Sequence, residues 1–177
     1  MQWKHIDSPP PKKARVQPSA GKVMLTVFLD QDGVVMTDFL AKGTTIPGAY
    51  YASLLMKLRE AIKIKRRGKI SKDILLLQDN APVHNSRVAR SEAQACVYEL
   101  LPHPPYSPDL APSDFHLFQA MKLFLKGKRF PDDAALISEV TSWLEDQPGV
   151  FYKNGLQSCI KRWEKCVTLG GSYVEKD

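Results

Sequence analysis

The sequence has few cysteines and no long apolar run. Its three cysteines, Cys96, Cys159 and Cys166, form an odd set without CxxC spacing. A disulfide framework or a zinc cage is therefore not expected, and a reducing intracellular compartment is favoured. No stretch approaches the roughly 18 apolar residues that cross a bilayer. The N-terminus also lacks the apolar segment of a secretory signal. We expect an intracellular, soluble chain without a membrane partner.

What the sequence does contain is the composition of a globular domain. Its 177 residues are 44% hydrophobic and 25% charged, which is enough for one domain with a tail. The net charge of +6 is unevenly spread, because residues 1–22 carry +4, residues 57–72 carry +7, and the remainder carries −5. Local basicity on a mildly acidic body indicates a polyanionic partner.

The order of the hydrophobic patterns predicts a mixed α/β domain. Two β-branched runs, at 22–30 and 33–40, meet at an Asp-Gly turn, which is typical of an antiparallel hairpin. Short apolar runs at 73–78 and 96–101 predict two further strands, the first of them buried on both faces. Helical spacing predicts helices over the remaining segments, at 49–64, 86–95, 113–125, 132–145 and 150–167. We expect the hairpin to lead into parallel strands through a helical crossover.

Two aspartates follow the predicted inner strands. Asp79 lies just past the strand at 73–78, and Asp114 begins the helix after a proline-rich loop at 102–112. If the strands at 73–78 and 96–101 lie side by side, both carboxylates would meet at one edge of the sheet. They would then be suitable oxygen ligands for Mg²⁺ or Mn²⁺. The alternatives are a turn residue for Asp79 and a helix-dipole contact for Asp114.

Longer motifs carry a resemblance to a known family. The stretches LLLQDNAPVH (75–84) and ELLPHPPYSPDLAPSDFHLF (99–118) closely resemble the mariner branch of the Tc1/mariner transposases. So do KVMLTVFLDQDGVV (22–35), GKRF (127–130) and KRWEKCVTLGGSY (161–173). The resemblance implies an α/β fold of the RNase H-like (retroviral-integrase-like) kind, a mixed sheet flanked by helices. It also implies a triad of metal-binding aspartates that serves DNA cleavage and transfer.

The resemblance assigns roles to particular residues. Asp79 and Asp114 bracket residues 80–113, and this spacing of 34 is the family's spacing between the second and third catalytic aspartates. It therefore implies that both are catalytic and bind Mg²⁺ (or Mn²⁺), whereas Asp109 is not a triad position. No small-molecule cofactor is implied. A similar domain occurs fused to a SET-domain methyltransferase, but this sequence contains no SET stretch, so methyl transfer is not expected.

The family's first catalytic aspartate has no match in residues 1–22. We therefore expect residues 1–21 to be a basic, Pro-rich arm, the remnant of an inter-strand loop. Residues 22–177 are expected to be a partial RNase H-like catalytic domain whose opening central strand is missing. Metal would then bind weakly if at all, and cleavage would be severely impaired. The monomer should be poorly stable unless Met1–His5 or a partner strand fills the gap.

Two basic segments predict contacts with DNA phosphates. The residues concerned are Lys12, Lys13, Arg15, Lys65, Arg66, Arg67 and Lys69. For the second segment, a solvated helix end is an equal alternative, since cations favour helix C-termini. The first segment also resembles a short nuclear-import signal, so a nuclear location is expected. The intact family implies a homodimer.

Three functions follow from these observations. The first is a truncated mariner-type transposase catalytic domain that binds DNA and is defective in cleavage. The second is an active fragment that a partner chain completes with the missing metal ligand. The third is a domesticated DNA-binding or dimerisation module without catalysis.

Overall fold

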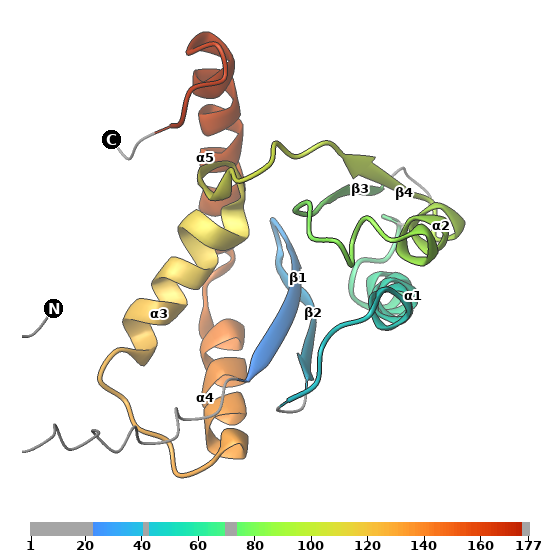
Figure 1. Ribbon diagram of the computed structural model, residues 1–177. Coiled ribbons are helices and arrows are strands. Elements are labelled where there is room, and N and C mark those ends of the chain that lie inside the picture. The colour runs from blue at the N-terminus through green and yellow to red at the C-terminus, as the bar shows by residue number, and fades with distance from the viewer. Residues whose placement is uncertain (1–22, 41–42, 70–73, 175–177) are drawn as a thin grey trace, which may run out of the picture.

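The computed structural model describes residues 23–40, 43–69 and 74–174. The expected arm at 1–21, with Lys12, Lys13 and Arg15, lies outside the described residues, and so does Met1–His5. Within the described ranges the elements follow the predicted order of two strands, a helix, a strand, a helix, a strand and three helices (Figure 1).

The hairpin forms where the sequence predicts it. Strand β1 (Met24–Asp30) pairs antiparallel with β2 (Gly33–Leu40). At the turn the Asp32 amide donates to the Asp30 carboxylate at 2.9 Å. Gly33 has a φ of 122°, a conformation that side chains with a Cβ rarely adopt, which explains the glycine at this position.

The second pair of strands is parallel, as predicted. Strand β3 (Ile74–Leu77) pairs with β4 (Tyr98–Leu101), and helix α2 (Arg87–Ala95) makes the crossover between them. Helix α2 begins after Ser86, whose hydroxyl accepts a hydrogen bond from the Ala89 amide at 3.2 Å.

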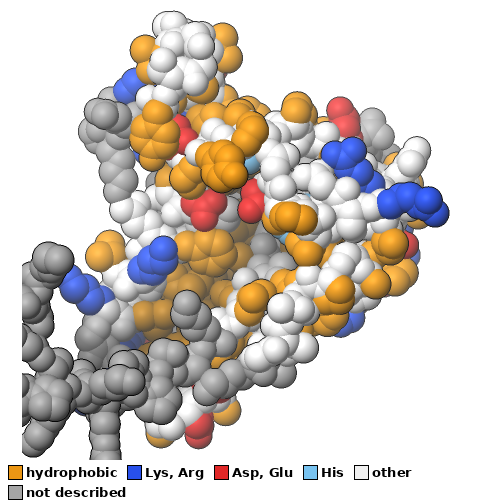
Figure 2. Space-filling model, viewed as in Figure 1, with side chains coloured by type: hydrophobic (Ala, Val, Ile, Leu, Met, Phe, Trp, Pro, Cys, Tyr) orange, Lys and Arg blue, Asp and Glu red, His pale blue; other side chains and the backbone are white. Residues whose placement is uncertain are grey.

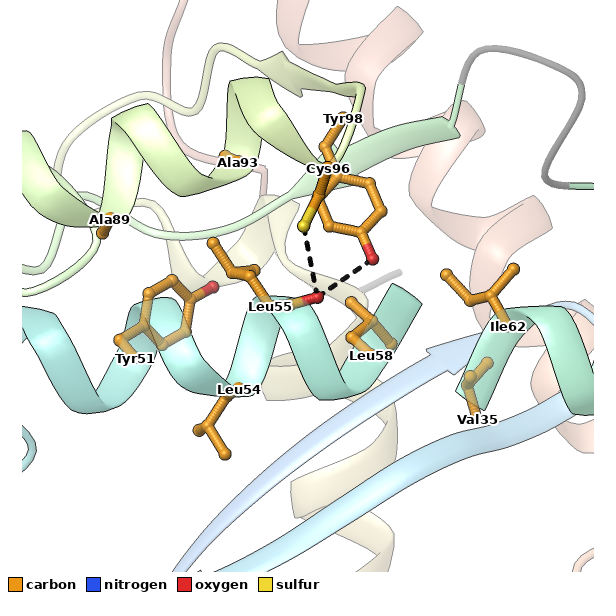
Figure 3. Close-up of a cluster of buried hydrophobic side chains, with 10 residues drawn as sticks. All are labelled: Val35, Tyr51, Leu54, Leu55, Leu58, Ile62, Ala89, Ala93, Cys96 and Tyr98. Carbon is orange, nitrogen blue, oxygen red and sulfur yellow. Dashed lines mark hydrogen bonds between the residues drawn. The ribbon is translucent and has the colours of Figure 1, made fainter. Parts of the chain in front are cut away.

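Helix α1 (Gly48–Lys65) contributes buried side chains to a first hydrophobic core (Figure 3). Its side chains of Leu54 and Leu55 are fully buried. The Leu55 carbonyl accepts hydrogen bonds from the Tyr98 hydroxyl at 3.3 Å and from the Cys96 thiol at 3.8 Å. These contacts join α1 to the end of α2 and the start of β4.

A second core lies on the other side of the hairpin. It is built from α3 (Gln119–Leu125), α4 (Asp133–Asp146) and α5 (Gly149–Thr168). A wide, π-helical turn at Ser113–Phe118 leads into α3, where the sequence predicts one continuous helix. Figure 1 shows these helices standing against the hairpin, with α1 on its opposite side.

The described strands make two separate two-stranded sheets, because β1 pairs only with β2 and β3 pairs only with β4. The prediction that β3 is buried on both faces is wrong, since Leu75 is 57% exposed. The physical reason is that α1 and α2 cover one face of the β3–β4 pair, whereas the helices of the second core pack on the hairpin instead. No helix within the described ranges is long and apolar enough to span a bilayer.

Candidate functional site

The parallel pairing of β3 and β4 sets the position of the site. Leu77 lies opposite Leu101, so the chain leaves both strands at the same edge. Asp79 and His103 each come two residues after these paired residues, and the Asn80 side-chain amide donates to the His103 carbonyl at 2.6 Å. The expectation that β4 runs beside β3 and returns the chain to this edge is confirmed.

Local hydrogen bonds orient the Asp79 carboxylate. Its Oδ1 accepts a hydrogen bond from the Ala81 amide at 3.0 Å and lies 2.7 Å from His84 Nδ1. The Asp79 side chain is nonetheless 60% exposed. One carboxylate oxygen is thus held by the turn, while the carboxylate as a whole stays open to solvent and to ligands.

A tyrosine from α1 contacts the residues on either side of this turn. The Tyr51 hydroxyl donates to the Gln78 side chain at 2.8 Å, and the Tyr51 ring lies 4.2 Å from the His84 ring between centroids. Burial raises the pKa of Tyr51, and the negative charge of Asp79 raises it further. Tyr51 therefore stays protonated and acts as a hydrogen-bond donor that fixes Gln78 beside the site.

Asp114 lies in the wide turn before α3, and the negative charge of Asp79 affects the pKa of its carboxyl. Burial raises the pKa of the Asp114 carboxyl, and repulsion from Asp79 raises it further, against smaller opposing effects of His103 and Lys122. The two carboxylates are thus close enough to interact. Figure 2 shows acidic side chains close together beside a hollow with a hydrophobic floor.

The loop that carries Asp114 is tied to α5. The carbonyl of Asp109 accepts from Arg162 at 3.1 Å, and the carbonyl of Leu110 accepts from the Trp163 indole at 3.1 Å. Asp109 is buried, and its Oδ2 accepts from the Val174 amide at 2.9 Å. Asp109 therefore fastens the loop to the segment after α5 instead of facing the site.

The pair Asp79 and Asp114 has the chemistry to hold a divalent cation. Carboxylate oxygens suit Mg²⁺ and Mn²⁺, and Mg²⁺ commonly takes only one or two carboxylates together with water and substrate phosphates. Burial and, to a smaller extent, repulsion from Asp79 raise the pKa of Asp114, and a cation bound to both carboxylates would oppose both effects. Among the residues that the structure describes, no group of three or more His, Cys, Asp or Glu side chains is placed to hold a metal.

The basic residues at the end of α1 and just after it are of two kinds. Arg66 pairs with Asp30 at 2.8 Å, and Lys69 contacts Asp30 at 3.1 Å and Asp32 at 2.6 Å. Burial acts to raise the pKa of Asp30, but hydrogen bonds from Arg66, the Asp32 amide and Lys69 hold it below its ordinary value. Arg66 and Lys69 therefore tie the end of α1 to the hairpin turn. Their neighbours Lys65 and Arg67 are exposed.

His84 and His103 are not among the site residues predicted from the sequence. The structure brings His84 into contact with Asp79 and His103 within electrostatic reach of Asp114. The parallel register could have found His103, because it lies as far beyond β4 as Asp79 lies beyond β3. No comparable signal marks Tyr51, which reaches the site from another element.

Comparisons with known proteins agree with this geometry. A family model described as transposase, partial DDE domain, matches residues 1–72. The chain is 36% identical over 187 residues to the mariner Mos1 transposase of Drosophila mauritiana, covering 98% of this chain and 54% of that protein. It is 35% identical over 160 residues to the human histone-lysine N-methyltransferase SETMAR, covering 87% of this chain and 23% of that protein.

Solved structures extend the comparison to the fold. The Mos1 transposase catalytic domain, solved with raltegravir and Mn, matches with a TM-score of 0.84 and 38% identity over 88% of this chain and 78% of that chain. The chain thus spans about half or less of the two full-length relatives but most of the isolated catalytic domain. With its RNase H-like fold, the chain belongs to the family of mariner-type transposases, in the region of their catalytic domain.

Proposed function

We propose that this chain is a DNA-binding, metal-dependent catalytic domain of a mariner-type transposase, and that its cleavage activity is strongly reduced. The observation that carries the proposal is the parallel register that ends β3 and β4 at one edge, with Asp79 just beyond it and its charge acting on Asp114. Two carboxylates that repel one another on an open surface are a poor structural pair, but they are good joint ligands for a cation.

Asp79 and Asp114 would hold Mg²⁺ or Mn²⁺ in this proposal. The Mos1 catalytic domain has been solved with each of these metals. A divalent cation in such a site supplies activation of a water or 3′-hydroxyl and stabilisation of the leaving oxygen. His84 and the Ala81 amide occupy Oδ1 of Asp79 and thereby orient its other oxygen.

DNA is the partner in this proposal. Mos1 structures include a paired-end complex with the left transposon end. Among the described residues from Lys65 to Lys69, the exposed Lys65 and Arg67 are the cations that remain available to DNA phosphates. Arg66 and Lys69, also predicted to bind DNA, would contribute mainly by holding the helix end in place. A homodimer and a nuclear location are part of the same proposal, on the evidence of family membership and of the basic segment at 12–15.

The reduced activity rests on the ligand set. Because the described residues contain no group of three or more His, Cys, Asp or Glu side chains placed to hold a metal, a cation bound by the two carboxylates would be weakly held and out of position. An active fragment, completed by a ligand from a partner chain, is the second candidate. It is favoured by the retention of both Asp79 and Asp114 at the family's spacing. A DNA-binding or dimerisation module without catalysis is the third.

The test combines strand cleavage with DNA binding. Supercoiled plasmid is incubated with the chain in Mg²⁺ or Mn²⁺, beside Asp79→Asn, Asp114→Asn and the control Asp146→Asn, which changes an exposed carboxylate on α4. Mn²⁺ binding is followed by electron paramagnetic resonance. We expect weak Mn²⁺ binding that both site variants abolish and Asp146→Asn preserves, with little nicking by any of them.

DNA retention is measured on the same samples at about 50 and 200 mM salt, where phosphate contacts weaken steeply. Arg67→Ala should lower retention and the salt slope, whereas Lys153→Ala on α5 should not. Metal-dependent nicking that vanishes in both site variants would establish the completed active fragment instead. Mn²⁺ binding unaffected by either variant would contradict the metal site itself.

A further inference from the structure

A cavity of about 420 Å³ extends from Asp79 along β4 to α2. Its volume is within the range of about 300–1,000 Å³ that is typical of small-molecule sites. Asp79 lines the cavity and Asp114 does not, so the cavity reaches beyond the pair of carboxylates described above. The other lining residues come from the exits of β3 and β4, from β4 itself and from α2.

One part of the lining is apolar. It consists of the Tyr98 ring, Leu100, Leu101 and Pro102. Tyr98 is 6% exposed, and its hydroxyl donates to the Leu55 carbonyl at 3.3 Å, which holds the ring in the first core (Figure 3). This part of the cavity offers a fixed surface on which a flat apolar ring would pack.

Another part of the lining carries three side-chain amides, those of Asn80, Asn85 and Gln94. The Asn80 amide is held by its bond to the His103 carbonyl at 2.6 Å. The Asn85 side-chain oxygen accepts from Arg90 at 2.8 Å. An amide or a guanidinium has more donors and acceptors than one such bond uses. These side chains are therefore oriented in advance for a ligand, which lowers the entropic cost of binding it.

The charges of the lining favour a neutral ligand over an anion. The charged side chains among the lining residues are Asp79 and Arg90, one of each sign. An anion would be attracted by Arg90 but repelled by Asp79. A neutral ring with donors and acceptors on its edge avoids this repulsion and still uses the amides and the guanidinium.

We propose that this cavity binds a single unpaired nucleobase, and that the base belongs to a DNA strand that passes Asp79. The base would pack against the apolar part of the cavity and present its edge to the amides and to Arg90. Amide and guanidinium side chains are the groups that most often recognise base edges, and extruded bases are held between apolar surfaces. DNA as the source of the base rests on the proposed function, whereas the binding of the base requires no metal.

The first test follows free nucleosides by NMR, on the full ¹⁵N-labelled chain in the presence of a metal chelator. The probes are the four deoxynucleosides, with deoxyribose and inorganic phosphate as controls. We expect at least one nucleoside to shift the side-chain amide signals of Asn80, Asn85 and Gln94 saturably, and neither control to do so. Equal shifts with phosphate would show an anion site and overturn the proposal. Absence of shifts with all four nucleosides would also overturn it.

Two variants on α2 locate the binding. Arg87 and Arg90 are both exposed, and only Arg90 of the two lines the cavity. We expect Arg90→Ala to weaken nucleoside binding at least tenfold and Arg87→Ala to change it less than twofold. Circular dichroism verifies that both variants fold. Equal effects of the two substitutions would place the nucleoside elsewhere.

The second test identifies DNA as the source of the base. A labelled duplex carries one unpaired nucleotide at its 3′ end, with the base that binds most tightly as a nucleoside. The control duplex has an abasic nucleotide there, so that the number of phosphates is the same. We expect at least fivefold tighter binding of the first duplex by fluorescence anisotropy, a difference that Arg90→Ala removes and Arg87→Ala preserves.

Equal binding of the two duplexes would overturn DNA as the source, and a difference that persists in Arg90→Ala would overturn the cavity as the site. Both measurements are made without metal. Failure of the proposed metal site, seen as Mn²⁺ binding that Asp79→Asn and Asp114→Asn leave unchanged, is therefore distinguishable from failure of this inference.

Discussion

The two site aspartates belong to parts of the molecule that are held together differently. Asp79 follows β3, in the part formed by β3, β4, α1 and α2, and its hydrogen bonds come from residues two and five positions away. Asp114 precedes α3, and its loop is tied to α5 by bonds between residues 53 and 65 positions apart. One carboxylate is oriented locally and the other through tertiary structure.

The hairpin is what the two parts share. One of its faces packs on α1 and the other on α4 and α5. The distance between Asp79 and Asp114 therefore depends on contacts made through the hairpin, since β3 itself makes no backbone pairing with β1. The following predictions test this difference, from the largest expected effect to the smallest.

The largest expected difference in stability is between substitutions of a buried and of an exposed leucine. Leu117 is 1% exposed in the second core, and Leu75 is 57% exposed on β3. Leu117→Ala should lower the free energy of unfolding by about 2–5 kcal/mol, because it removes buried methyl groups and leaves a cavity. Leu75→Ala should cost under about 1 kcal/mol. Urea unfolding measures both, and similar losses would mean that β3 is covered after all.

A smaller effect is expected where Asp114's turn meets α5. A Cβ added at Gly155 would lie 2.7 Å from the His116 ring, which also hydrogen-bonds the Phe151 carbonyl through Nε2 at 2.9 Å. Gly155→Ala should therefore cost about 1–3 kcal/mol through overpacking.

The matched control is Gly149→Ala in the same helix, where an added Cβ would meet nothing within 4 Å. It should change the free energy of unfolding by under about 1 kcal/mol, since alanine has the higher helix propensity. Equal stability of the two variants would show that the turn and α5 are not firmly packed.

The smallest effect concerns the coupling between the two parts. Because Asp79 helps to raise the pKa of Asp114, Asp79→Asn should lower that pKa toward its ordinary value. A raised pKa means that folding favours the protonated carboxyl. Asp114 therefore stabilises the fold at low pH, and this contribution is lost as the pH rises through the folded pKa. Carboxyl NMR titration measures the shift. An unchanged Asp114 pKa in Asp79→Asn, with Asp146→Asn as the control, would mean that the two aspartates do not meet.

Much of the fold could be predicted from the sequence, because its signals are local. The Asp-Gly turn before Val34 and the helical spacing of Leu54, Leu55 and Leu58 each specify an element within a short window. The exposure of Leu75 could not be predicted, because an apolar strand such as ILLL is compatible with helices packed on one face of the sheet or on both faces. Covering depends on where distant helices pack.

The site was predictable only in part for the same reason. Asp79 and Asp114 were identified by motif and spacing, and their roles in metal binding stay predictions. The pairing of Arg66 and Lys69 with Asp30 and Asp32 was not foreseen, because these residues are more than 30 positions apart. A cluster of basic residues in the sequence does not predict which carboxylates will lie beside it in the folded chain.

The buried Asp109 has a consequence for the order in which the molecule is completed. Its carboxylate accepts a hydrogen bond from the amide of Val174, 65 residues later. During synthesis, β1 to β4 and their helices can associate while residues 162–174 are still in the ribosome. The contacts that hold the loop of Asp114 cannot form until that segment has emerged. Asp114 is thus fixed only after residues up to Val174 have emerged, later than the part of the molecule that carries Asp79.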